Sequence, residues 1–169
     1  MIKIEKATIN DAYDYAKILN QSWKDTYHEY ISIDHINNEF NIENLVKAFP
    51  TIINSKNELC MIKYKGKNIG ILQIGIPEDV YKSDMQDYGE ILSLHIKKEY
   101  CGRGFGTLAI DFATNRLKQL GFKHLCVWVK KQNYKAINFY KSKGFVETNY
   151  SCEETIDGAP SFVMEKNNI

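Results

Sequence analysis

The sequence has almost no net charge, because 22 Lys and Arg residues are balanced by 21 Asp and Glu residues to leave a formal net charge of +1. A domain that binds nucleic acid or an anionic membrane by electrostatic attraction needs a basic excess on its surface. This composition supplies no such excess. We therefore expect neither nucleic acid nor a membrane among the partners of this protein.

Long apolar runs and closely paired cysteines are also lacking. No apolar run approaches the roughly 18 residues that a membrane-spanning helix needs, and the N-terminus has no basic segment followed by an apolar one. The four cysteines are widely spaced, with no C-x-x-C pair, which favours free thiols. These absences predict a reduced, cytoplasmic protein without a metal site. The cysteines are Cys60, Cys101, Cys126 and Cys152.

A length of 169 residues corresponds to one ordinary domain, which buries roughly 70% of the surface of its unfolded chain. Alternating apolar residues predict strands, and apolar residues at helical spacing predict helices between them. Their order predicts a single α/β domain over residues 1–169, with a mixed central sheet of about seven strands and helices on both faces. Strands are expected at 1–7, 58–64, 68–74, 88–96, 124–130, 145–150 and 161–165, and helices at 12–19, 34–39 with 41–53, 107–120 and 133–143.

Three details of this pattern are specific enough to check. Pro50 should end or bend the helix at 41–53, because proline lacks the N–H that continues a helix. The segment 76–87 carries Pro77 and four acidic residues between apolar strands, so it should be a surface loop. The helix at 107–120 should turn five apolar residues inward, namely Leu108, Phe112, Ala113, Leu117 and Leu120.

Three alternate glycines follow the expected strand at 88–96 and open the next helix. Such a junction presents unpaired backbone N–H groups and the positive end of a helix dipole. Without Cβ atoms at Gly102, Gly104 and Gly106, a diphosphate could approach the main chain, and the loop could use positive φ angles. The junction therefore predicts a phosphate-binding loop.

Two other phosphate-binding motifs can be compared with these residues. A P-loop requires Lys before its Ser or Thr, whereas Thr107 directly follows Gly106, so that motif is excluded. The residues from Gly104 to Ala109 fit the dinucleotide pattern G-x-G-x-x-A. That pattern expects an acidic residue about 20 positions on, where this chain has the basic pair at 130–131. A dinucleotide-binding oxidoreductase stays as a minor alternative.

A second motif follows downstream, and the two together resemble the GCN5-related N-acetyltransferase (GNAT) superfamily. The chain reads Cys-Gly-Arg-Gly-Phe-Gly at 101–106 and Asn-Tyr-Lys-Ala-Ile-Asn-Phe-Tyr-Lys-Ser-Lys-Gly-Phe at 133–145. The superfamily has Arg/Gln-x-x-Gly-x-Gly/Ala and then Asn-x-x-Ala-x-x-Phe-Tyr-x-x-x-Gly-Phe. Cys101 departs from this pattern, which removes one side-chain contact to the pyrophosphate, and Arg103 is the candidate replacement.

The resemblance implies a domain whose middle strands splay apart to hold acetyl-CoA, with no metal. It implies that backbone N–H groups in the strand hold the acetyl carbonyl and pantetheine arm, where they stabilise developing oxyanion charge. Asn133 matches a cofactor-contacting asparagine, although asparagine is also an ordinary helix cap. The implied cofactor-binding residues are Leu94, His95, Ile96, Cys101, Gly102, Arg103, Gly104, Phe105, Gly106, Thr107, Asn133, Ala136, Tyr140 and Lys143.

Acetyl transfer to an amine needs a base, because an alkyl ammonium of pKa about 10.4 is neutral in only about one molecule in 10³ at pH 7. Glu90 matches the glutamate that related histone-acetylating members use through a water. His95 is a rival, but odd and even strand positions face opposite sides. Tyr140 matches the superfamily's general acid, which protonates the leaving thiolate. A paired strand carboxylate and a core tyrosine remain the structural alternatives for Glu90 and Tyr140.

The resemblance implies that the acceptor is a small-molecule or peptide amine. Trp23 and Tyr27 lie four residues apart, on one helical face where superfamily members line the acceptor pocket. Glu153, with Glu154 and Asp157, is expected to form an acidic mouth that favours a polycation, and Glu90 is expected to reach the acceptor. Core aromatics and solvated surface acids are the structural alternatives. An acyl-CoA-binding domain without turnover also stays open, as does the choice between monomer and homodimer.

Overall fold

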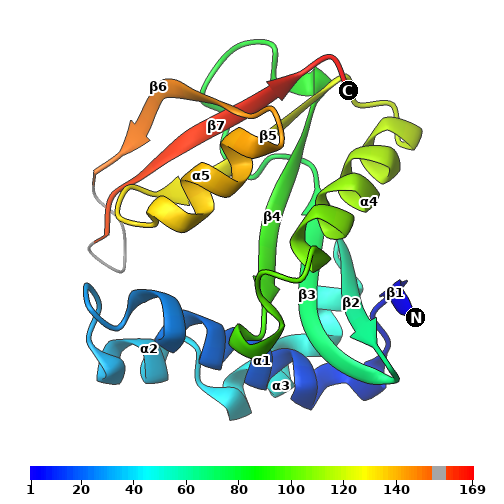
Figure 1. Ribbon diagram of the computed structural model, residues 1–169, viewed down its shortest axis with the longest axis vertical. Coiled ribbons are helices and arrows are strands. Elements are labelled where there is room, and N and C mark those ends of the chain that lie inside the picture. The colour runs from blue at the N-terminus through cyan, green and yellow to red at the C-terminus, as the bar shows by residue number, and fades with distance from the viewer. Residues whose placement is uncertain (154–158) are drawn as a thin grey trace. The chain divides into compact units, whose positions relative to one another are not determined.

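The computed structural model describes residues 1–153 and 159–169, and its seven strands form one mixed sheet in the order β1-β2-β3-β4-β5-β7-β6 (Figure 1). The predicted α/β class with a mixed sheet is confirmed. Contacts group the residues into two compact units, unit 1 at 1–73 with 93–109 and unit 2 at 74–92 with 110–169. The strands are β1 Ile2–Lys6, β2 Glu58–Tyr64, β3 Lys67–Gly75, β4 Tyr88–Ile96, β5 His124–Lys130, β6 Val146–Cys152 and β7 Ser161–Asn167.

Unit 1 is built on a β-hairpin and three helices. The β2–β3 turn has positive φ angles at Lys65 (49°) and Gly66 (77°), which matches the twist of a tight hairpin. β1 pairs antiparallel with β2, from Ile2 opposite Tyr64 to Lys6 opposite Cys60. The helices are α1 Ala12–Tyr27, α2 Ile33–Glu39 and α3 Ile42–Ile53.

The core of unit 1 lies where α1 packs against α3 and β2. The rings of Tyr15 on α1 and Phe49 on α3 have centroids 5.1 Å apart, and Leu59 and Met61 of β2 belong to the same buried cluster. Burial of apolar area of this kind is the main stabilising contribution to such a unit. It fixes α1 on the sheet residues of unit 1, and α1 carries Trp23 and Tyr27, which are predicted to line the acceptor pocket.

The expected break between α2 and α3 is confirmed, but Pro50 does not end α3. Asn41 caps α3, because its Oδ1 accepts a hydrogen bond of 3.1 Å from Asn44 N–H. The helix continues past Pro50 to Ile53, and Asn54 Nδ2 donates to Pro50 O over 2.8 Å at its end. The buried face of the helix, which includes Phe49, is therefore retained despite the missing N–H.

Unit 2 centres on β5, which has one parallel neighbour, β4, and one antiparallel neighbour, β7. β5 runs parallel to β4, with Tyr88 beside His124 and Glu90 beside Cys126. It runs antiparallel to β7 along its whole length, and β7 pairs in turn with β6 across an irregularity between Glu147 and Ser151. Figure 1 shows β7 in red between β5 and β6.

Two helices complete the fold, α4 Phe105–Gln119 and α5 Tyr134–Ser142. α4 begins two residues earlier than the pattern predicts, and its buried residues include Ala109, Ala113 and Leu117. The prediction that Leu108 and Leu120 face inward is wrong, since they are 44% and 50% exposed. At 100° per residue Leu108 lies opposite Leu117, and Leu120 follows the last helical residue.

The segment at 76–87 is more ordered than the predicted surface loop. Ile76 and Val80 are exposed, but Met85 is buried, and Tyr81 and Trp128 pack against the cluster that contains it. The segment ends in a short 3₁₀ turn, η2, over Met85–Asp87. No helix in the described ranges has the length and apolar character needed to cross a membrane.

The contrast between Leu117 and Leu120 gives a test of α4 packing. A Cβ placed on Gly89 of β4 would come within 2.9 Å of Leu117 Cδ2, so the leucine packs directly on the strand. Leu117→Ala should lower the free energy of unfolding by about 2–5 kcal/mol, the usual cost of a cavity. The exposed control Leu120→Ala should change it by less than about 0.5 kcal/mol. Equal losses in urea titrations would contradict the described face of α4.

Candidate active site

In unit 1, the glycines at the start of α4 leave open space in front of the main chain. Gly102 and Gly104 have φ angles of +75° and +82°, and a Cβ added to either would meet no described atom within 4 Å. Gly104 O accepts from Leu108 N–H over 3.1 Å, so the N–H groups of the first helical turn follow directly. The open, N–H-lined loop has the shape that an anionic group such as a pyrophosphate requires.

The side chains of this loop are partly engaged already. Cys101 is exposed, and its Sγ lies 3.6 Å from Ile96 O and 3.7 Å from Lys97 O, as a weak S–H donor. The guanidinium of Arg103 lies 5.4 Å from the centroid of the Tyr100 ring. Phe105 is buried, with its ring 4.9 Å from that of Tyr64. The Cys101 side chain thus points toward the end of β4. It does not supply the phosphate contact that Arg or Gln makes at this position of the motif.

His95 is held in a neutral state at the end of β4. Its Nδ1 lies 2.9 Å from Ser22 Oγ of α1, and burial lowers its pKa to about 4. A Cβ on Gly70 would meet His95 O at 2.6 Å, so glycine allows β3 to approach here. A group of such low pKa is a weak proton acceptor, which ranks His95 below a carboxyl of higher pKa as a base.

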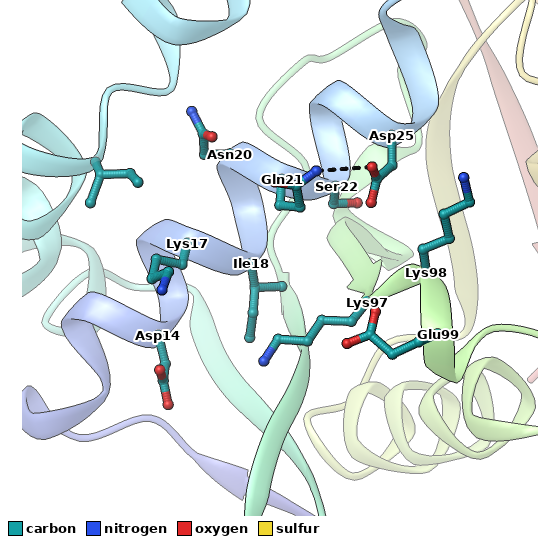
Figure 2. Close-up of a pocket in the computed structure, with 11 residues that line it drawn as sticks. Asp14, Lys17, Ile18, Asn20, Gln21, Ser22, Asp25, Lys97, Lys98 and Glu99 are labelled. Atoms are coloured by element: carbon teal, nitrogen blue, oxygen red, sulfur yellow. Dashed lines mark hydrogen bonds between the residues drawn. The ribbon is translucent and has the colours of Figure 1, made fainter.

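A pocket of about 260 Å³ lies in unit 1 between α1 and the segment after β4 (Figure 2). Figure 2 shows Asp14, Lys17 and Asp25 on the α1 side, with Gln21 Nε2 donating to Asp25 Oδ1 over 2.9 Å. Lys97 and Glu99 face them from the other side. Charges of both signs line the pocket, and none of the described residues predicted for the site is among its lining residues.

In unit 2, Glu90 is a buried carboxylate with a single described backbone donor. It lies on β4 and is only 5% exposed, and its Oε2 accepts from Glu78 N–H over 3.0 Å. Burial, and secondly the charges of Glu78 and Asp79, raise its pKa to about 7, against the opposing effect of the hydrogen bond. A carboxyl with this pKa changes its protonation state at neutral pH, as a general base must.

The neighbour of Glu90 on β5 is a thiol that does not compete for this role. Cys126 lies beside Glu90 in the parallel pairing and is buried. Burial first, and then the charge of Glu90, raise the pKa of Cys126 to about 12. The thiol therefore stays protonated across the range in which Glu90 ionises.

The predicted acid and three predicted cofactor contacts lie on or beside α5. Tyr140 is buried, with ring centroids 5.4 Å from Phe139 and 5.3 Å from Phe145. Asn133 is the N-cap of α5, since its Oδ1 accepts from Ala136 N–H over 3.1 Å. Lys143 is the C-cap residue, with Nζ 5.8 Å from the centroid of the Phe139 ring. These contacts support both structural alternatives, the core tyrosine and the helix cap, while the functional roles stay predictions.

The predicted acceptor residues are placed less favourably than expected. Trp23 stacks on Phe40 at 4.2 Å and contacts Tyr27 at 4.7 Å, against the core of unit 1. Glu153 forms an ion pair with Lys131 and accepts from Ser151 Oγ, which lowers its pKa. The other two acids of the expected mouth, Glu154 and Asp157, lie outside the described residues.

Sequence reasoning missed the partners of the key groups. Glu78 supplies the hydrogen bond to Glu90, Cys126 lies beside it, and Ser22 binds His95. Of these partners, only Glu78 could have been suspected from the sequence. It lies in the acidic loop at 76–87, and loops of this length in compact domains are often functional. Within the described residues, no group of three or more His, Cys, Asp or Glu side chains is placed to hold a metal.

Comparison with known proteins gives one consistent result. The chain is 29% identical to an uncharacterized N-acetyltransferase, YuaI of Bacillus subtilis, over 84% of this chain and 79% of that protein. It is 28% identical to a spermidine N(1)-acetyltransferase of Thermoplasma acidophilum over 98% of this chain and 96% of the relative. The PaiA N-acetyltransferase of Thermoplasma acidophilum, solved in complex with coenzyme A, has a similar fold, with a TM-score of 0.77, 23% identity and 99% coverage of both chains.

The family model for the acetyltransferase (GNAT) family matches residues 14–145, which include the glycine loop, Glu90 and the helix that carries Tyr140. This match extends over well more than half of the chain and contains both motifs on which the predicted resemblance rests. The predicted membership is therefore confirmed, and the chain belongs to the acetyltransferase (GNAT) family.

Proposed function

We propose that this protein is an acetyl-CoA-dependent N-acetyltransferase that acts on the primary amine of a small cationic molecule, with a polyamine such as spermidine as the leading candidate. The observation that carries the proposal is the buried carboxyl of Glu90, whose pKa of about 7 suits a base at neutral pH. Family membership supports the acetyl transfer, and the spermidine-acetylating relative supports the class of acceptor. A peptide amine is the alternative acceptor.

The glycine loop of unit 1 fits the diphosphate of the donor. Open space in front of Gly102 and Gly104 leaves room for an anion at the N-terminus of α4. The proposal places the N–H groups of Leu94 and Ile96 on the acetyl carbonyl and pantetheine arm, and Asn133, Ala136 and Lys143 on the remainder. Bound acetyl-CoA supplies the reactive thioester.

Two residues of unit 2 carry the proton transfers. Glu90 takes one proton from the acceptor ammonium, directly or through a water, and the freed amine forms the new N–C bond to the acetyl carbon. The C–S bond then breaks, Tyr140 donates its phenolic proton to the departing thiolate, and the Tyr140 phenolate regains a proton as the acylated nitrogen loses its second proton through solvent. Deprotonation by Glu90 offsets the roughly 4.6 kcal/mol that it costs, at pH 7, to neutralise an alkyl ammonium whose pKa is about 10.4. The product is an acetamide with free CoA.

The cationic acceptor is supported by acids near Glu90 rather than by the expected mouth. Glu78 and Asp79 lie close enough for their charges to raise the pKa of Glu90. Glu153 is already neutralised by Lys131. A second ammonium of a polyamine would relieve the repulsion among the three carboxylates, which a neutral amine cannot do.

Three further parts of the proposal concern the protein as a whole. Residues 1–169 are proposed to act as one acetyltransferase domain, since the family model extends across both units. The proposed location is the cytoplasm, in keeping with four cysteines that are all free thiols. The proposal is compatible with both a monomer and a homodimer.

The direct test is a screen of amines for CoA release from acetyl-CoA. Spermidine and a diamine should give kcat/KM values at least about tenfold above those of a neutral amine, and the difference should shrink as salt screens the charges. Release of CoA without preference for cations would disprove the acceptor class alone. Tight CoA binding without release from any amine would favour the non-catalytic alternative.

The pH dependence should report Glu90. Because the base must be ionised in the free enzyme, kcat/KM should rise with pH through about 7, the pKa of Glu90. Glu90→Gln should remove this rise and lower kcat at pH 8 by roughly 10² to 10⁴. An unchanged pH profile in a folded Glu90→Gln variant would assign the base elsewhere, with His95→Gln as the next variant to measure.

Tyr140→Phe removes only a hydroxyl from a buried ring. The variant should bind CoA nearly as tightly as the parent, yet turn over roughly 10² to 10⁴ times more slowly. Calorimetric titration with CoA, beside initial rates, separates the two effects. Parallel losses of binding and turnover would instead assign Tyr140 to packing against Phe139 and Phe145.

A further inference from the structure

A buried ion pair in unit 2 has no part in the chemistry proposed so far. Lys82, in the segment 76–87, lies 2.7 Å from Glu165 Oε1 on β7, and both side chains are largely out of water. Removing two charges from water costs more than their attraction returns unless further hydrogen bonds satisfy them. Because most residues of the segment 76–87 are exposed, the position of this ion pair needs an explanation.

Tyrosines supply those further hydrogen bonds. Tyr81 OH donates to Glu165 Oε1 over 2.8 Å, and Tyr88 OH lies 3.3 Å from Oε2. Lys82 Nζ donates to Tyr88 OH over 2.7 Å and lies 4.0 Å from the centroid of that ring. The hydrogen bonds to Glu165 and Tyr88 outweigh the effect of burial and raise the pKa of Lys82, so the ammonium stays charged. The network joins the segment to β7 and to the start of β4.

This attachment lies a few residues from a hydrogen bond that the segment makes to Glu90. Glu78 N–H donates to Glu90 Oε2 over 3.0 Å, and Val80, between Glu78 and the attached residues, is exposed. Glu78 and Asp79 are themselves exposed, so their side chains bury nothing that could hold the backbone in place. The nearest fixed points that follow them are Tyr81 and Lys82.

We propose that the Lys82–Glu165 pair, with Tyr81, is a positioning device that fastens the segment 76–87 and thereby holds the Glu78 N–H against the Glu90 carboxylate. The inference rests on the proposed function for the role of Glu90 as base. Lys82, Glu165 and Tyr81 are positioning residues, because they act through the segment and not on the acceptor.

The charges that face Glu90 determine the direction of the expected effect. Glu78 and Asp79 face it from the segment and Cys126 faces it from β5, with Tyr81, Lys82 and Glu165 next to Cys126. Release of the segment would admit water and move two carboxylates away, and both changes lower the pKa of Glu90. Loss of the Glu78 hydrogen bond raises it, but burial is the largest single cause of the shift. The net change is a decrease.

The experiment removes both charges of the pair together, so that no buried charge is left without its partner. The variant is Lys82→Met with Glu165→Gln, and the control is Lys141→Met with Glu147→Gln, which removes an exposed ion pair of the same unit. NMR follows two quantities in each protein, the carboxyl titration of Glu90 and the amide proton of Glu78. Neither readout requires turnover, so both remain valid if the proposed acetyltransferase reaction is not observed.

In the parent, the Glu78 amide shift should follow the titration of Glu90 with a midpoint near 7. In the double variant, that amide should no longer follow Glu90, its hydrogen exchange should be at least tenfold faster, and the Glu90 midpoint should fall by about one pH unit. The control should match the parent. Where acetyl transfer is measurable, kcat should fall at an unchanged KM for acetyl-CoA.

Tyr81→Phe removes one hydroxyl and keeps the ion pair, so it serves if the double variant does not fold. It should produce the same changes to a smaller degree, with Glu78 exchange at least threefold faster. A Glu78 amide that still follows Glu90 as in the parent in the folded double variant, or that exchanges no faster in Tyr81→Phe than in the parent, would overturn the proposal. Faster exchange with an unchanged Glu90 midpoint would also overturn it, because the pair would then fasten the segment without acting on the carboxylate.

Discussion

The proposed chemistry depends on keeping one carboxyl group out of water. The parallel pairing of β4 with β5 places Glu90 beside Cys126 in the interior of unit 2, where ionisation is opposed by burial. A single backbone N–H keeps the ionised form accessible near neutral pH. Cys126 and Tyr81, whose pKa values are raised by burial, remain neutral while Glu90 titrates. Neither the Cys126 thiol nor the Tyr81 phenol therefore competes with Glu90, the proposed proton acceptor.

The two units contribute different kinds of residues. Unit 1 holds the glycine loop, which offers main-chain donors and needs no particular side chain. Unit 2 holds Glu90 and Tyr140, the proposed base and acid, whose roles depend on their side chains. β4 belongs to both, with residues up to Leu92 in unit 2 and those from Ser93 in unit 1. One continuous strand therefore carries the proposed base and the proposed oxyanion donors.

The sequence predicted the parts that depend on local pattern. Two motifs were sufficient for the family, and period-2 alternation located the strands to within a few residues. Features set by tertiary partners could not be predicted: Glu153 pairs with Lys131, 22 positions earlier, and Pro50 is tolerated because Phe49 packs on α1. The inward face of α4 was misjudged because Leu108 and Leu120 are apolar without being buried. The segment 76–87 was predicted to be a surface loop because its four acidic residues dominate the pattern. The two residues that pack inward, Tyr81 and Met85, do not form a recognisable apolar repeat.

The glycine loop has a consequence for how tightly it can bind. Gly102 and Gly104 occupy left-handed conformations in the folded chain, and Phe105, packed on Tyr64, fixes the residue that follows them. Glycine loses more conformational freedom than any other residue when it becomes ordered. Because the fold itself gives the two glycines these conformations, that loss accompanies folding, and the proposed pyrophosphate would meet a preorganised set of donors. The three glycines therefore lower the stability of the fold slightly, because the denatured chain is flexible at these positions. They do not lower the affinity for the proposed pyrophosphate.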